Sequence, residues 1–98
     1  MKEQNLPHDH GHNNEELIRK HLPGEAEIAG VSEAMKQLGD PSRLRIFWLL
    51  CHCEECVVNI AAIVNMTSPA VSHHLRILKS SGPIISRRDG KEMYYKTA

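Results

Sequence analysis

The sequence predicts a mainly α-helical domain that ends in a small β-hairpin. The 98 residues are enough for only one hydrophobic core. Hydrophobic residues make up 41% of the chain and aromatic residues only 4%, which is typical of helices packed through Leu, Ile, Val and Ala. Near the C-terminal end, Asp89-Gly90 separates two short strand-like runs. This dipeptide is a strong signal for a hairpin turn.

The N-terminal part of the chain predicts a flexible arm followed by two helices. Residues 1–14 are polar and contain three histidines, so we expect them to form a flexible arm. A short helix is expected over residues 15–22, closed by Pro23-Gly24. A second helix is expected over about 25–38, where apolar residues recur at helical spacing. Gly39-Asp40-Pro41 should stop that helix.

The third predicted helix should be the central one. Asp40 is expected to cap its N-terminus, with Pro41 at the first helical position, where proline is tolerated. We expect this helix to be buried nearly all round. The apolar residues that support this are Leu44, Ile46, Phe47, Leu49 and Leu50. The stretch CHCEEC, residues 51–56, should end the helix.

The C-terminal part predicts two helices joined by a tight turn and followed by a basic hairpin. The expected elements are a short helix at about 57–64, a turn at Asn65-Met66, a helix capped by Thr67 or Ser68 that runs to about Ser80, and strands at about 84–88 and 92–96. This order is a winged helix-turn-helix, in which the second helix of the motif enters the major groove. We therefore interpret residues 15–98 as a DNA-binding domain of this fold.

The last predicted helix has one apolar face and one face suited to DNA. Val71, Leu75 and Leu78 share the apolar face, which should pack on the third helix. The groups that bond phosphates and base edges project elsewhere: Ser68, Ser72, His73 and Arg76 from the helix, and Arg87, Arg88 and Lys91 from the hairpin, or wing. Charge agrees with this prediction. Residues 41–98 carry eight basic residues against four acidic ones, and residues 1–40 carry four against eight.

Composition also excludes several classes of protein. No apolar run approaches the ~18–20 residues that cross a bilayer, and the N-terminus is too polar for a signal peptide. We therefore expect a cytoplasmic protein with no membrane partner. The sequence contains no Gly-rich phosphate loop and no paired carboxylates in a pocket-forming context. We expect that it is not an enzyme.

All three cysteines, Cys51, Cys53 and Cys56, lie within six residues. In a reducing compartment such a cluster indicates metal ligands or sensing thiols more than a disulfide framework. Thiolates suit soft ions, here zinc, cadmium, lead or arsenic(III). Two alternatives stay open: Cys53 and Cys56 could sense oxidants by forming a disulfide, and Cys51 could pack in the core as a small apolar residue.

Three stretches resemble the ArsR/SmtB family of metal-responsive bacterial repressors: LGDPSRLRIFWLL, CVVNIAAIVNMTSPAVSHHLRILKSSG and ISRRDGKEMYYK. The resemblance covers roughly residues 33–97. It implies a homodimer that binds an imperfect inverted repeat in operator DNA and is released when a metal or metalloid ion binds. It also implies DNA contacts from Ser68, Ser72, His73 and Arg76. Regulation of the same fold by cysteine oxidation, and a winged helix that binds proteins, are the alternative hypotheses.

The sequence departs from the family pattern in three places. The family usually continues past the wing into a dimerisation helix, whereas this sequence stops at Ala98. Pro83 replaces a usual Leu or Ile and should shorten the wing. The family's metal-binding C-V-C-D reads here as CVVN from Cys56 onward, so Cys51 and Cys53 are expected to supply the missing thiolates. Further candidate ligands are His8, His10 and His12, because in related sensors an N-terminal arm, often from the other subunit, closes the site.

Overall fold

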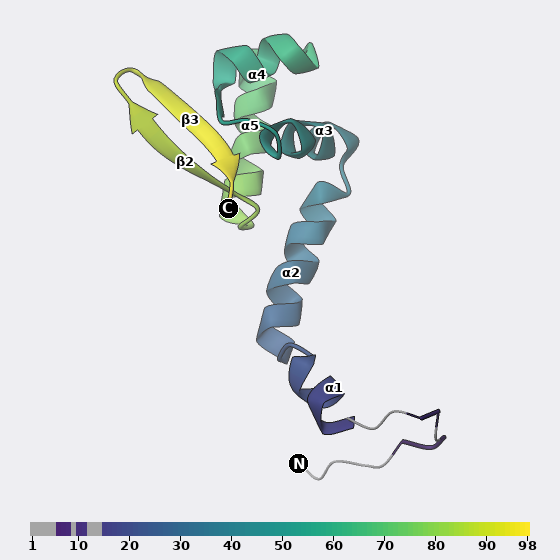
Figure 1. Ribbon diagram of the computed structural model, residues 1–98. Coiled ribbons are helices and arrows are strands. Elements are labelled where there is room, and N and C mark those ends of the chain that lie inside the picture. The colour runs from purple at the N-terminus through teal and green to yellow at the C-terminus, as the bar shows by residue number, and fades with distance from the viewer. Residues whose placement is uncertain (1–5, 9, 12–14) are drawn as a thin grey trace.

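The computed structural model describes residues 6–8, 10–11 and 15–98. The elements, in chain order, are α1 (Glu15–His21), α2 (Glu25–Leu38), α3 (Pro41–Leu50), β1 (Glu55–Cys56), α4 (Val57–Val64), α5 (Ser68–Ser80), β2 (Ile84–Asp89) and β3 (Glu92–Thr97). Helices α3, α4 and α5 pack together beside the small sheet, and α2 and α1 extend away from them (Figure 1). The predicted winged helix-turn-helix is confirmed, with α4 and α5 as the motif and the β2–β3 hairpin as the wing.

The hydrophobic core lies entirely within the part of the chain after α2. It is formed by nine buried residues: Ile46, Leu50, Ile60, Ala61, Val64, Val71, Leu75, Leu78 and Ile84. These come from α3, α4, α5 and the start of β2. The expectation that α3 is buried nearly all round is wrong. Leu44 is 41% exposed and Trp48 is 65% exposed, because α4 and α5 cover only one side of α3.

Local signals fix the ends of the core helices as predicted. The Asp40 carboxylate accepts a hydrogen bond from the backbone N–H of Arg43 at 3.0 Å and caps α3. The Thr67 hydroxyl accepts one from the backbone N–H of Ala70 at 3.3 Å and caps α5. Asn65 ends α4 in the left-handed conformation, with φ of 56°, which asparagine tolerates better than most residues.

The sheet has a third strand that the sequence did not predict. Its strand order is β1-β3-β2, and both pairs are antiparallel. The wing register runs from Ile84 opposite Thr97 to Asp89 opposite Glu92, with Gly90 at φ +62° in the turn between them. Pro83 stands immediately before β2, and its carbonyl accepts a hydrogen bond from the backbone N–H of Ala98 at 3.0 Å. Because proline has no N–H, the return hydrogen bond to Ala98 is missing, which fits the end of the strand better than its middle. Strand β1 adds the end of the CHCEEC stretch to the edge of the wing.

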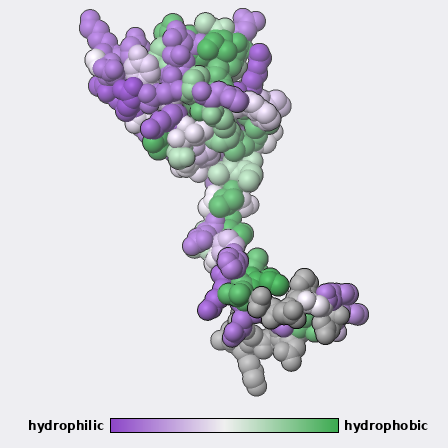
Figure 2. All heavy atoms as spheres, in the orientation of Figure 1, coloured by the Kyte–Doolittle hydropathy of each residue, from purple (hydrophilic) through white to green (hydrophobic). Residues whose placement is uncertain are grey.

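Helices α1 and α2 contrast with the body of the domain, because no residue of either helix is buried. In α2, Ile28, Val31 and Met35 form an apolar stripe and are 51%, 54% and 65% exposed. Figure 2 shows this apolar surface continuing along the narrow part of the molecule. No helix among the described residues is long and apolar enough to cross a membrane.

Candidate nucleic-acid interface and cysteine segment

Helix α5 presents the predicted polar face outward. Val71, Leu75 and Leu78 are fully buried on the opposite side. On the outward face, His73 and Arg76 are exposed and Ser72 is half-buried. Ser68 is exposed at the first position of the helix. The geometry therefore brings together hydroxyl, imidazole and guanidinium groups on one rigid helix, where they can hydrogen-bond to a duplex.

Arg43 is a structural link that the sequence did not reveal. Its Nε donates to the Gln37 carbonyl of α2 at 2.8 Å, and its Nη1 lies 3.3 Å from Nδ1 of His74 in α5. His74, in α5, is partly buried. This burial is the main cause that lowers the pKa of its imidazole. Neutral His74 can accept the Arg43 hydrogen bond. Arg43 of α3 therefore joins α2 and α5 through these two contacts.

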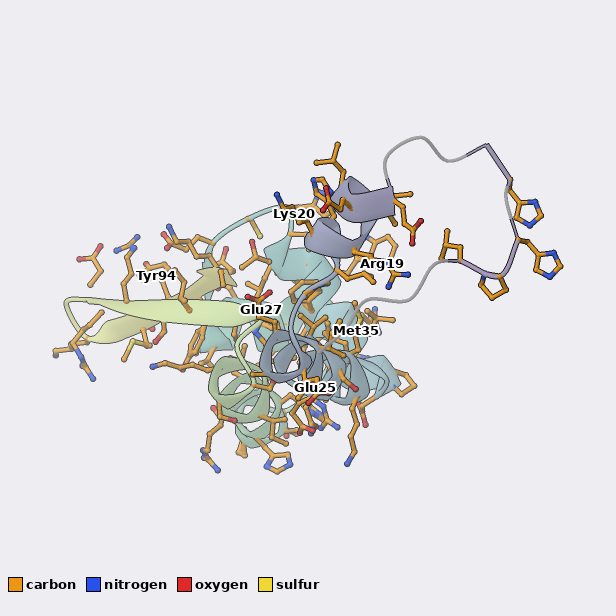
Figure 3. All side chains as sticks on the ribbon, turned by 90° about the horizontal axis from the view of Figure 1, so that it is seen from below. Arg19, Lys20, Glu25, Glu27, Met35 and Tyr94 are labelled. Atoms are coloured by element: carbon orange, nitrogen blue, oxygen red, sulfur yellow. The ribbon has the colours of Figure 1, made fainter. Side chains whose placement is uncertain are left out.

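The three basic residues of the wing differ in what surrounds them. Arg88 and Lys91 are exposed and form no ion pair with any residue that the structure describes. Arg87 is bound. Its Nε lies 3.1 and 3.0 Å from the two carboxylate oxygens of Glu54, and its Nη2 lies 2.6 Å from Oε1. Its guanidinium also lies 4.9 Å from the ring centre of Tyr94, which Figure 3 labels on the wing.

The contact between Glu54 and Arg87 changes the pKa of both groups. The hydrogen bonds from Arg87 lower the pKa of the Glu54 carboxyl, and those same bonds raise the pKa of Arg87. The neighbouring Glu55 has a different role. Its carboxylate accepts hydrogen bonds from the backbone N–H of Cys56 at 3.0 Å and from Asn59 Nδ2 at 2.8 Å. Glu55 thereby helps to satisfy the N-terminus of α4.

The three cysteines are free thiols in different surroundings. Cys51 is exposed after the end of α3, which rules out the alternative that it packs in the core as a small apolar residue. Cys53 is exposed, and its Sγ donates to the Leu49 carbonyl at 3.6 Å. Cys56 is only 8% exposed, because it lies in β1 and immediately precedes α4. After Leu50 the chain is exposed at Cys51 and Cys53, and the next buried residue is Cys56 in β1.

The predicted ligands that the structure describes do not come together in one site. No group of three His, Cys, Asp or Glu side chains among the described residues is placed to hold a metal ion. His8 and His10 stack on each other with ring centres 5.8 Å apart. The described residues 6–8 and 10–11, which include these two histidines, lie beyond α1 and away from the wing (Figures 1 and 3). His12 lies outside the described residues.

A pocket of about 610 Å³ lies beside the cysteine segment. Its wall is mostly apolar and comes from α3, the loop after it and α4. The lining residues are Pro41, Leu44, Arg45, Trp48, Leu49, His52, Cys53, Ile63 and Val64. The exposed side of α3, where the sequence led us to expect burial, therefore forms one wall of a pocket that reaches Cys53.

Comparison with known proteins identifies the family. The model of the bacterial regulatory protein arsR family matches residues 40–86. The chain also resembles the homodimeric winged helix-turn-helix DNA-binding domain of a "possible ArsR-family transcriptional regulator" from Mycobacterium bovis. The TM-score is 0.69 and the identity 33%, over 79% of this chain and 76% of that one. This chain belongs to the ArsR family.

Two relatives within the ArsR family are transcriptional regulators. One is a "Transcriptional repressor SmtB homolog" from Synechocystis sp., 43% identical over 69% of this chain and 52% of the relative. Another is a "Cadmium resistance transcriptional regulatory protein CadC" from Listeria innocua, 44% identical over 70% of this chain and 59% of the relative. The chain thus spans between half and three fifths of these two relatives. The expectation that it is not an enzyme agrees with a family of regulators.

Proposed function

We propose that this chain acts as a DNA-binding transcriptional repressor of the ArsR/SmtB type. The outward face of α5 carries this proposal. Arg76 and His73 project from a helix whose other side is locked into the core through Leu75 and its neighbours. A rigid second helix of a helix-turn-helix can hold such groups against base edges, and exposed Arg88 and Lys91 can bind the flanking phosphates. Because the chromosome is the target, we infer that the protein acts in the cytoplasm.

We propose a homodimer that forms through α1 and α2. A helix as short as α2, with 14 residues, is marginal in water without packing, yet its apolar stripe is exposed in the single chain. A second copy could cover this stripe. Two α5 helices related by a two-fold axis would match an operator built as an imperfect inverted repeat. The homodimeric domain from Mycobacterium bovis supports this proposal.

We propose that a soft metal or metalloid ion releases the repressor from DNA. The exposed thiols of Cys51 and Cys53 can be reached by zinc, cadmium, lead or arsenic(III), all of which suit thiolate ligands. A third donor would come from Cys56, if β1 opens, or from His8, His10 or His12 of a second copy. The resemblance to the cadmium resistance regulatory protein CadC from Listeria innocua supports an ion as the signal. The ion can act only through a difference in affinity between the free and DNA-bound states.

The test of DNA binding uses fluorescence anisotropy with the DNA upstream of the gene for this chain, and with a scrambled duplex. We expect specific binding that weakens steeply with salt, since each phosphate contact adds about 0.9 to the logarithmic salt slope. Arg76→Ala should cost about 1–3 kcal/mol on the specific duplex. Lys36→Ala, which removes an exposed charge from α2, is the matched control. Equal affinity for both duplexes, with no effect of Arg76→Ala, contradicts the proposal.

The test of the inducer is a cadmium titration of the reduced protein. We expect a thiolate charge-transfer band that saturates at a fixed stoichiometry, protection of the thiols from a disulfide reagent, and loss of the DNA complex. Cys53→Ser should abolish the saturable band. Release of DNA by an oxidant but not by cadmium would replace this mechanism with thiol oxidation. No saturable band and no release by either agent removes the cysteines from the signal.

A further inference from the structure

The cysteine segment and the wing are joined by an ion pair with fork geometry. Glu54, between Cys53 and Cys56 in sequence, presents both carboxylate oxygens to Arg87 of β2. Nε and Nη2 of Arg87 are both engaged, at 2.6–3.1 Å. This two-pronged arrangement fixes the orientation of both side chains, which a single contact between point charges does not. The pair connects residues that are 33 positions apart in the chain.

The backbone places Arg87, one partner of this ion pair, on a row that crosses the whole sheet. Cys56 of β1 is the partner of Tyr94 in β3, and Tyr94 is in turn the partner of Arg87 in β2. The Arg87 guanidinium lies over the Tyr94 ring at 4.9 Å. Helix α4 begins at the residue after Cys56. The segment that carries the cysteines is therefore fixed to the wing on one side and to the helix-turn-helix on the other.

The same contact makes Arg87 a poor ligand for DNA. The donors Nε and Nη2 are already used by Glu54, and Nη1 lies 3.7 Å from a carboxylate oxygen of Asp89. A phosphate that approached Arg87 would meet two carboxylates of its own charge. Arg88 and Lys91, without an ion-pair partner among the described residues, carry no such penalty. Arg87 therefore has a different task from its two basic neighbours.

We propose that the ion pair between Glu54 and Arg87, the clasp, positions the wing. Through this pair, a structural change in the cysteine segment, such as ion binding, alters the DNA-binding face. This inference rests on the proposed function for its regulatory part. If the thiolates of Cys53 and Cys56 converge on one soft cation, buried Cys56 has to leave its place in β1. Glu54, which lies between these two cysteines, moves with the segment, and its hydrogen bonds to Arg87 break. The wing and the start of α4 are then released together.

The first experiment measures the coupling between cadmium and DNA. The quantity is the ratio of the DNA dissociation constants with and without cadmium, which for allosteric proteins is typically ~5–150-fold. We expect this ratio to fall toward one in Glu54→Gln and in Arg87→Ala, while the cadmium charge-transfer band remains. Arg88→Ala is the matched control: it should weaken DNA binding and keep the ratio. An unchanged ratio in both clasp variants overturns the proposed transmission.

The second experiment needs neither metal nor DNA. In a protein with Cys51→Ser and Cys53→Ser, the buried Cys56 is the remaining thiol, and its reaction rate with a disulfide reagent reports how often β1 opens. We expect Arg87→Ala and Glu54→Gln to raise this rate severalfold and Arg88→Ala to leave it unchanged. Equal rates in all four proteins overturn the clasp. If cadmium does not release the parent protein from DNA, the inducer proposal has failed, and this rate alone decides whether the clasp exists.

Discussion

Helices α2 and α5 are nearly the same length and have similar apolar patterns, but they have opposite surroundings. The apolar positions of α5, Val71, Leu75 and Leu78, are completely buried. In α2, Val31 and Met35 occupy an equivalent stripe and are more than half exposed. Apolar periodicity thus identifies the face of a helix that needs cover. It does not show whether that cover comes from the same chain or from a second copy.

The ends of the two helices differ in the same way. The N-terminus of α5 is capped by the Thr67 hydroxyl, whereas α2 begins after Gly24 without a side-chain cap. Toward its other end, α2 is tied to the body through the Gln37 carbonyl, which accepts from Arg43 Nε. Helix α5 is therefore held by its own chain through its cap and its three buried side chains. The free part of α2 depends on the proposed dimer for its packing.

The largest expected difference between the two helices comes from removing a buried side chain. Leu75→Ala in α5 should lower the free energy of unfolding by about 2–5 kcal/mol, because it leaves a cavity in the core. Met35→Ala, the matched change in α2, should cost less than about 0.5 kcal/mol in the monomer, because Met35 is 65% exposed. Urea unfolding at low protein concentration measures both. Equal losses would mean that α2 is packed within the single chain.

A charge on the α2 stripe should weaken dimerisation and leave the body folded. We expect Val31→Asp to raise the dimer dissociation constant at least about tenfold, because an unpaired carboxylate would be buried in the interface. Sedimentation at several concentrations measures the constant, and circular dichroism checks the fold. Ala29→Asp adds the same charge on another side of α2 and should have little effect. If Val31→Asp associates as well as the parent protein, α2 does not form the interface.

The contrast between local and long-range signals also explains how much of the fold could be predicted. The bounds of α4, the cap at Thr67 and the hairpin at Asp89-Gly90 are encoded by neighbouring residues. The first and third were predicted as the structure has them, and Thr67 was one of the two caps predicted for α5. Strand β1 was missed. It consists only of Glu55 and Cys56, and its pairing partner, β3, lies almost forty residues later. Two residues contain no alternating pattern, so only tertiary packing could define this strand.

The candidate site shows the same limit. The type and position of Arg87 made it look equivalent to Arg88 and Lys91, but Glu54 on a distant loop engages it. The cysteines could be found by spacing, yet their burial could not. Cys51 follows two leucines, which left burial in the core open as an alternative, but α3 ends there and Cys51 is exposed. The outward face of α5 was predicted correctly because a helical wheel requires only local sequence.

A smaller effect is expected from the cap that distinguishes α5 from α2. Thr67→Ala should lower the free energy of unfolding by about 1 kcal/mol, because the backbone N–H of Ala70 loses its acceptor. Thr67→Ser keeps a hydroxyl at the same place and should retain the stability. Thermal unfolding of the two variants measures the difference. If serine and alanine are equally destabilising, the methyl group of Thr67 rather than its hydroxyl stabilises the helix start.

The smallest expected effect is the pH dependence of the α3 cap. The backbone hydrogen bond from Arg43 is the main cause that lowers the pKa of Asp40 below its ordinary value of 3.8. The unfolded chain therefore takes up a proton at Asp40 before the folded one does. The stabilisation is complete above the unfolded pKa and is lost as the pH falls through the lower folded pKa. Asn is as good a cap as Asp but does not titrate. Between roughly pH 5 and pH 2, Asp40→Asn should thus lose less stability than the parent protein. Urea midpoints at several pH values measure this loss. An identical loss in both proteins would mean that Asp40 does not contribute to the acid dependence.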